Sequence, residues 1–215
     1  MVRDVLVFTP ILRIEPETLD AIFSLEWDEK ISFLLQRDNP IGPMRDKLKR
    51  SVMNHLHQFQ RGREMFLAGS YDAMLVIESD IIPPVDTLEK LAALDADCAY
   101  GVYRFRASNV INVYERYPQP ARNMGESLSV HPRKLKAAVK QGIYPCSGAG
   151  FGCILIKRNV VEEMPFYVRW PKHGAHCDTP WNEGVYQAGY SQIADMSVIC
   201  GHKTPEGEVL WPDLS

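Results

Sequence analysis

Short apolar runs alternate along this chain with segments of helical periodicity, and this alternation constrains the fold most. Strand-like runs cover residues 4–10, 31–36, 71–80, 97–103, 150–157 and 191–202, with helical segments at 16–26, 44–67, 84–94, 131–142 and 179–190. The run from Ala73 to Ile77 is wholly apolar, which is typical of a strand buried on both faces of a parallel sheet. The pattern therefore predicts an α/β/α sandwich around a mostly parallel central sheet.

The chain is long enough to bury one sizeable core. It has 215 residues, of which 46% are hydrophobic, and chains of this size still fold as one unit. No internal repeat and no linker divides the sequence. We therefore expect a single domain over residues 1–215.

Composition argues against several classes of partner and location. The net charge of −3 provides no overall attraction to nucleic acid or to anionic membranes. No apolar run reaches the ~20 residues that span a bilayer, and the N-terminus lacks a signal-peptide layout. The five cysteines are scattered without zinc-type spacing, which favours reduced thiols. We expect a cytoplasmic protein without a transmembrane segment, and leave peripheral membrane attachment open.

Two carboxylates directly follow the most apolar strand. Glu78 and Asp80 lie in the stretch LVIESDIIPP, residues 75–84. Open α/β sheets bind ligands beyond the carboxyl ends of their strands, and Mg²⁺ is commonly held by one or two carboxylates plus substrate phosphates. The pair therefore indicates a divalent-cation site at this edge of the sheet. The alternative is an acidic turn in which Asp80 caps the next helix.

The order of these motifs resembles that of GT-A-fold glycosyltransferases, in particular the family 2-like enzymes. Their metal motif is an apolar strand followed by Asp-x-Asp, where this chain has Glu-Ser-Asp. Residues 5–11 resemble the family's first strand, and residues 148–164 its acceptor-side strand and helix. Residues 177–190 resemble the Glu-Asp motif and its helix, with Asp178 eleven positions before Gly189. The resemblance covers most of the chain and implies a GT-A (Rossmann-like) fold.

The same resemblance implies metal-dependent, inverting transfer of a sugar from a nucleoside-diphosphate sugar. Asp80 would bind Mn²⁺ or Mg²⁺, and Glu78 would lie near the metal or the ribose of the donor. His202, in the stretch CGHKTP, matches the histidine that completes the metal shell in many family members. Imidazole suits manganese better than magnesium. The alternative for His202 is a structural hydrogen bond.

Asp178 is the expected catalytic base. Inverting transfer needs a carboxylate that removes the proton of the acceptor hydroxyl. Thr179 and Pro180 are typical of a helix start, whose dipole favours an ionised carboxylate. Cys177 stands where the family usually has Glu. The alternative is that Asp178 only caps the helix.

Four further residues are candidate donor contacts. Thr9 and Pro10 end the first strand, and Asp38, which follows the second, is a candidate acceptor of a hydrogen bond from the base of the nucleotide. Arg63, on the helix before the motif strand, is a candidate contact for the diphosphate. Each of the four is equally compatible with an ordinary structural or surface role.

Residues 150–152 are the candidate acceptor site. Gly150 and Gly152 flank Phe151, and small residues let the backbone approach a sugar closely. Tight packing of the strand is the equal alternative. The sequence does not select among a glycan, a lipid-linked sugar, a protein and a modified nucleic acid base as acceptor.

Two other functions fit parts of the pattern. A sugar-phosphate nucleotidylyltransferase shares the sheet and the metal, but it carries a glycine-rich loop and a lysine after its first strand. Residues 8–18 contain neither glycine nor lysine. The other function is non-catalytic binding of a nucleotide sugar. Hydrolysis of the donor with metal but without acceptor would distinguish an enzyme from such a binding protein.

Overall fold

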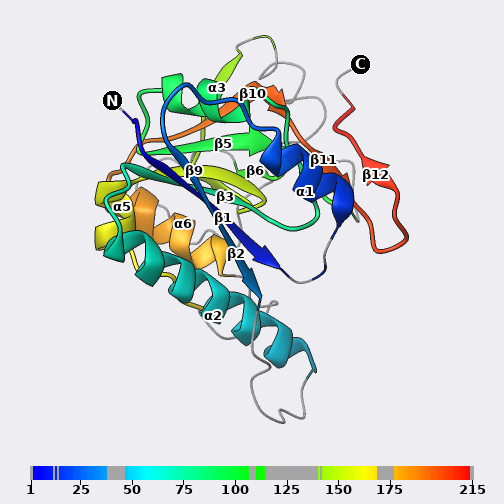
Figure 1. Ribbon diagram of the computed structural model, residues 1–215, viewed down its shortest axis with the longest axis horizontal. Coiled ribbons are helices and arrows are strands. Elements are labelled where there is room, and N and C mark those ends of the chain that lie inside the picture. Colours follow the sequence, from blue (N-terminus) through cyan, green and yellow to red (C-terminus); the bar gives the residue numbers. More distant parts are fainter. Residues whose placement is uncertain are drawn as a thin grey trace.

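A seven-stranded sheet forms the centre of the protein (Figure 1). The computed structural model describes residues 2–11, 13, 15–37, 47–106, 110–114, 140, 142–168 and 177–213. In spatial order the strands are β2 (Ile31–Arg37), β1 (Val5–Ile11), β3 (Ala73–Ile77), β9 (Cys153–Lys157), β5 (Cys98–Val102), β10 (Gln192–Ile199) and β7 (Ile143–Pro145). β1 runs parallel to β2 and β3, and β5 parallel to β10, whereas β9 and β7 are antiparallel to their neighbours. The prediction of a mostly parallel sheet is confirmed.

Helices cover both faces of this sheet. Helices α2 (Lys47–Ala68), α5 (Arg158–Glu163) and α6 (Asp178–Gln187) pack on one face, and α1 (Pro16–Phe23) and α3 (Thr87–Ala93) on the other. The alternation of side chains along a strand produces the two cores. Leu6 and Phe8 of β1 contribute to the first core, and Val5 and Val7 to the second. The three-layer α/β/α arrangement is thus confirmed.

Two small sheets lie beside the main one. β4 (Ile81–Ile82), β11 (Gly201–Lys203) and β12 (Val209–Leu210) form one, and β6 (Val113–Tyr114) and β8 (Gly148–Ala149) the other. The sequence predicted one continuous strand over 191–202, but the chain leaves the main sheet after Ile199 and pairs again as β11. Elements this short have no detectable hydrophobic period.

Some expectations concern parts of the chain beyond the described residues. Asp38 lies there, as does most of the expected helix at 131–142. All five cysteines are described, buried and free of disulfides, as predicted. Among the helices described, none is long and apolar enough to cross a bilayer.

Aromatic packing fastens α2 to the sheet. The ring of Phe59, which is fully buried, lies 5.5 Å from Phe8, 5.1 Å from Phe151 and 5.0 Å from Phe166 between centroids. Such aromatic pairs add to the free energy gained by burial. Phe59 therefore sets the position of the middle of α2 against the sheet.

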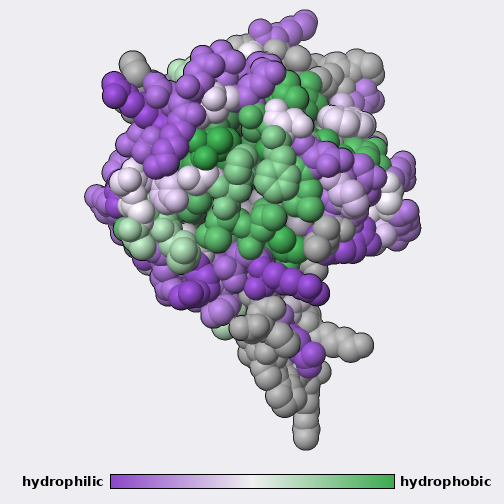
Figure 2. Space-filling view, viewed as in Figure 1, coloured by the Kyte–Doolittle hydropathy of each residue, from purple (hydrophilic) through white to green (hydrophobic). Residues whose placement is uncertain are grey.

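A different group of aromatic side chains is exposed. Figure 2 shows apolar side chains gathered on the face where the edge strand β2 lies in front. Phe23 of α1 is 55% exposed, and Phe33 and Leu35 of β2 are each 38% exposed. The rings of Phe23 and Phe33 meet at 5.1 Å. Replacing one of these exposed side chains by alanine leaves no closed cavity, whereas the same replacement of the buried Phe59 does.

We expect Phe59→Ala to lower the free energy of unfolding by about 3–5 kcal/mol, because it leaves a cavity in the aromatic core. Phe23→Ala, the control on an exposed aromatic, should change it by about 0.5 kcal/mol or less. Urea denaturation measures both, with Phe59→Leu as a milder variant if Phe59→Ala does not fold. Equal losses for Phe59→Ala and Phe23→Ala would contradict this account of the core.

Candidate functional site

Glu78 and Asp80 lie where β3 leaves the sheet. The backbone N–H of Glu78 donates to the carbonyl of Gly152 at 3.0 Å, and the N–H of Ile81 donates back to the carbonyl of Glu78 at 3.0 Å. This tight turn leads directly into β4. The side chains of Glu78 and Asp80 are 25% and 23% exposed. Both carboxylates are therefore at the carboxyl end of a parallel strand, as predicted.

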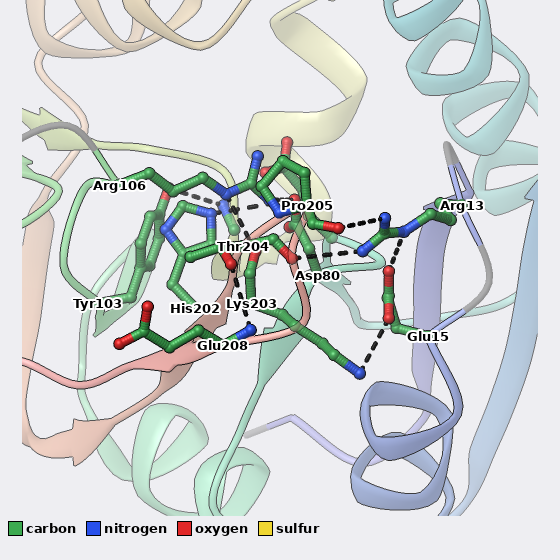
Figure 3. Close-up of polar contacts among 12 residues, drawn as sticks. Arg13, Glu15, Asp80, Tyr103, Arg106, His202, Lys203, Thr204, Pro205 and Glu208 are labelled. Atoms are coloured by element: carbon green, nitrogen blue, oxygen red, sulfur yellow. Dashed lines mark hydrogen bonds and ion pairs between the residues drawn. The ribbon is translucent and has the colours of Figure 1, made fainter.

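Pairing of β4 with β11 brings His202 next to Asp80. His202 lies opposite Ile81 in this antiparallel pair, and the N–H of Lys203 donates to the carbonyl of Asp80 at 2.8 Å. The Nδ1 of His202 is 2.8 Å from the carbonyl of Arg104. A carbonyl can only accept, so Nδ1 carries a proton, and in the neutral imidazole Nε2 has the free lone pair. That Nε2 lies 3.9 Å from Asp80 Oδ2 (Figure 3).

One oxygen of Asp80 is paired and the other is not. Arg106 forms an ion pair with Oδ2 and also donates from Nε to the carbonyl of Lys203 at 3.0 Å. The Oδ1 atom is buried and has no hydrogen-bond partner. A buried carboxylate oxygen without a partner is costly, which makes Asp80 Oδ1 a candidate ligand-binding atom.

A divalent cation fits these atoms. Asp80 Oδ1 and the free lone pair of His202 are ligands that Mn²⁺ accepts. Among the described residues no three His, Cys, Asp or Glu side chains are arranged to hold a metal ion. Protein ligands this few suit a cation that completes its shell with phosphate oxygens and water. The cavity beside Asp80 measures about 200 Å³ and is lined by Arg13, Glu15, Ser79, Asp80, Arg106 and Pro205.

Glu78 has a different partner, which the sequence did not reveal. Its Oε1 lies 3.1 Å from the Nε2 of His55, on α2. The Nδ1 of His55 is 3.7 Å from the Sγ of Cys177. Cys177 immediately precedes Asp178, so this line of contacts leads from the motif after β3 to the start of α6. A single histidine inside an amphipathic helix carries no sequence signal for such a role.

Their surroundings shift the pKa values of the two carboxyls in opposite directions. Burial alone would raise the pKa of Glu78, but the hydrogen bond from His55 and the positive charges nearby outweigh it and lower the pKa. Burial and the charge of Glu78 raise the pKa of Asp80, against the opposing charges of Arg106 and His202. Burial would lower the pKa of His55, but its contacts with Cys177 and Glu78 raise it well above the ordinary value. These opposite shifts of the two pKa values, together with the 3.1 Å contact, favour an ion pair between Glu78 and His55.

Asp178 is the first residue of α6, one position earlier than predicted. Cys177 is the N-cap, and its side chain makes no capping hydrogen bond. Asp178 Oδ1 accepts a hydrogen bond from the N–H of Thr179 at 2.8 Å.

The phenol of Tyr103 lies close to both Glu78 and Asp178. Burial, followed by the charges of Glu78 and Asp178, raises the pKa of Tyr103 well above its ordinary value. Glu78 and Asp178 are thus both within electrostatic reach of one phenol.

The candidate acceptor residues pack against the same phenol. A Cβ on Gly150 would lie 2.1 Å from the Tyr103 oxygen, and one on Gly152 would lie 2.6 Å from the Tyr103 ring. Phe151 is 1% exposed and belongs to the aromatic core. The structure therefore favours the packing alternative for these glycines, and Phe151 is a core residue rather than an acceptor contact.

The candidate donor contacts are placed differently from one another. Thr9 and Pro10 are buried in β1, whose end lies at the same edge as the end of β3, and Thr9 Oγ1 has no hydrogen-bond partner. Arg63 donates to the carbonyls of Val161 and Glu162, both at 2.7 Å. These carbonyls belong to α5, which follows the antiparallel β9 and therefore lies at the opposite edge of the sheet. The assignment of Arg63 to the diphosphate is wrong.

Fold and site together define a single mixed α/β, Rossmann-like domain with a cluster of charged residues at the carboxyl edge of its sheet. No family model matches the chain, and no curated protein matches it. Solved structures do match, among them that of A197 from STIV, with a TM-score of 0.59 and 17% sequence identity. The match covers 99% of this chain and 92% of A197. At this identity the likeness shows the fold alone.

We expect Arg106→Ala to strengthen the binding of Mn²⁺ in the absence of nucleotide. The guanidinium would compete with a cation for Asp80, and removing this partly exposed ion pair should raise affinity roughly two- to fivefold. Titration calorimetry measures the change, with Arg61→Ala, at an exposed ion pair with Glu64, as the control. Unchanged or weaker binding would show that Arg106 does not compete with the cation.

Proposed function

We propose that this protein is a metal-dependent, inverting glycosyltransferase that moves a sugar from a nucleoside-diphosphate sugar to an acceptor hydroxyl. The observation that carries the proposal is the unpaired, buried Oδ1 of Asp80, beside a histidine whose Nε2 is free to bind a cation. The order of motifs in the sequence and the gathering of Glu78, Asp80 and His202 at one edge support the same conclusion.

Asp80 and His202 would hold Mn²⁺ or Mg²⁺, and the diphosphate of the donor would supply further ligands. When bound, the cation neutralises negative charge on the departing diphosphate. Arg13 and Arg106 line the cavity beside Asp80 and add positive charge there. Glu78, held ionised by His55, is placed to accept hydrogen bonds from hydroxyls of the donor.

Asp178 would act as the general base. It takes the proton from the acceptor hydroxyl while that oxygen attacks the anomeric carbon from the face opposite the leaving diphosphate. The C–O bond to the acceptor forms as the bond to the diphosphate breaks, so no covalent enzyme intermediate is needed. The N-terminal end of α6 stabilises the ionised carboxylate.

The acceptor is a hydroxyl of a glycan, a lipid-linked sugar, a protein or a modified nucleic acid base. Buried, free cysteines support a reducing compartment, and we place the activity in the cytoplasm.

A second candidate function is metal-independent binding of a nucleotide sugar without transfer. The ion pair between Arg106 and Asp80 favours it, because a guanidinium can replace a cation beside phosphates. The contacts of the described residues add no support for the third function, that of a sugar-phosphate nucleotidylyltransferase.

We expect Asp80→Ala to abolish metal-dependent binding of the donor, because the cation loses its main protein ligand. The measurement is a thermal-shift screen of nucleoside-diphosphate sugars with and without Mn²⁺. Asp86→Ala serves as the control, since Asp86 forms a surface ion pair with Lys90 at 2.8 Å. Donor binding that is equal with and without metal in the unmodified protein would favour the metal-independent binder instead.

We expect Asp178→Asn to bind donor normally and to transfer sugar about 10²–10⁴-fold more slowly, because an amide cannot accept the proton. Release of nucleoside diphosphate with and without acceptor measures the rate. Glu183→Gln, on the same helix, is the matched control. Near-normal turnover of Asp178→Asn together with loss in Glu183→Gln would move the base to Glu183.

A further inference from the structure

The ring of His55 contacts both Glu78, after β3, and Cys177, the N-cap of α6. It lies eight residues before Arg63 on α2, a rise of roughly 12 Å in an α-helix. That rise explains why His55 is level with the site while Arg63 is at the other edge of the sheet. The helix therefore carries a site residue in its first half.

Both nitrogens of the His55 ring are engaged. Nε2 lies 3.1 Å from Glu78 Oε1, and Nδ1 lies 3.7 Å from Cys177 Sγ. The ring also packs edge-on against Phe59, at 4.9 Å between centroids and 89° between planes. Three contacts on three sides restrict the orientation of the imidazole. Any movement of the ring would shift Glu78 or Cys177.

The two partners serve different parts of the proposed reaction. Glu78 is on the donor side, at the end of β3, and Cys177 is covalently joined to Asp178, the proposed base. Burial raises the pKa of the Cys177 thiol, against the hydrogen bond from His55. His55 therefore spans the distance between the donor carboxylate and the helix that carries the base.

We propose that His55 is a positioning residue that sets the placement of Glu78 relative to Asp178 for glycosyl transfer. This inference rests on the proposed function, because it assigns Glu78 to the donor and Asp178 to the acceptor. His55 acts through these residues and does not itself touch the reacting atoms. Its two nitrogens have separable effects, one on donor binding and one on the transfer step.

Two substitutions separate the nitrogens. The amide of Gln reaches the position of Nε2, and the amide of Asn the position of Nδ1. In His55→Gln the contact with Glu78 is retained and that with Cys177 is lost, so donor affinity should stay near normal while kcat falls about tenfold or more. In His55→Asn the contact with Cys177 is retained, and donor affinity should weaken about 10- to 100-fold, the effect of losing a hydrogen bond to a charged group.

The experiment measures donor affinity, KM and kcat for both variants. His57→Gln, an exposed histidine two residues further along α2, is the matched control and should match the unmodified protein. Urea denaturation confirms that each variant is folded. Unchanged kinetics in both variants, or the same loss of the same parameter in both, would overturn the inference, because a merely structural histidine does not distinguish its nitrogens.

Failure of the proposed function is recognised separately. If the unmodified protein binds no nucleoside-diphosphate sugar with Mn²⁺, that function fails, and two double-mutant cycles in urea unfolding then test His55. One cycle combines His55→Asn with Glu78→Gln, and the other His55→Gln with Cys177→Ala. Non-additive shifts of the unfolding midpoint in both cycles support a residue that holds both partners. Additive shifts in either cycle overturn it.

Discussion

The pairing of β4 with β11 is the interaction on which the rest of the site depends. It joins the chain just after β3 to the chain just after β10, which are separated by two other strands in the main sheet. The bond from the N–H of Lys203 to the carbonyl of Asp80 fixes the register. The Nζ of Lys203 in turn lies 3.0 Å from a carboxylate oxygen of Glu15, before α1. Because backbone hydrogen bonds and a buried ion pair set this geometry together, Asp80 and His202 meet at one place.

Charge around the two carboxylates is arranged asymmetrically. Glu78 is paired with His55, whereas Asp80 shares one oxygen with Arg106 and leaves the other unpaired. When two carboxylates lie close together, their repulsion raises the pKa of at least one of them. The other partners of each carboxylate determine which one it is. Asp80 is the one whose pKa is raised. The less compensated carboxylate is thus the one with an unpaired oxygen, which is the arrangement that the proposed function requires.

The antiparallel direction of β9 relative to β3 determines which residues reach the site from that strand. Because β9 runs against β3, the residues before it lie at the carboxyl edge and the helix after it lies at the other edge. Gly150 and Gly152 therefore meet Tyr103 beside Glu78, while α5 accepts the hydrogen bonds of Arg63 away from the site. One strand direction accounts for both the packing role of the glycines and the wrong assignment of Arg63.

The sequence by itself determined the three-layer fold, the carboxylates after β3 and, to within one residue, the start of α6, because hydrophobic period and turn residues are local signals. Only the tertiary structure decided which residues share the site. His55 and Arg63 occupy the same helix, and no local pattern shows which of them is level with Glu78. The contact of Arg106 with Asp80 and the pairing that delivers His202 join residues far apart in the chain. Such contacts follow from strand order and direction, and these are set by packing of the whole chain rather than by any one segment.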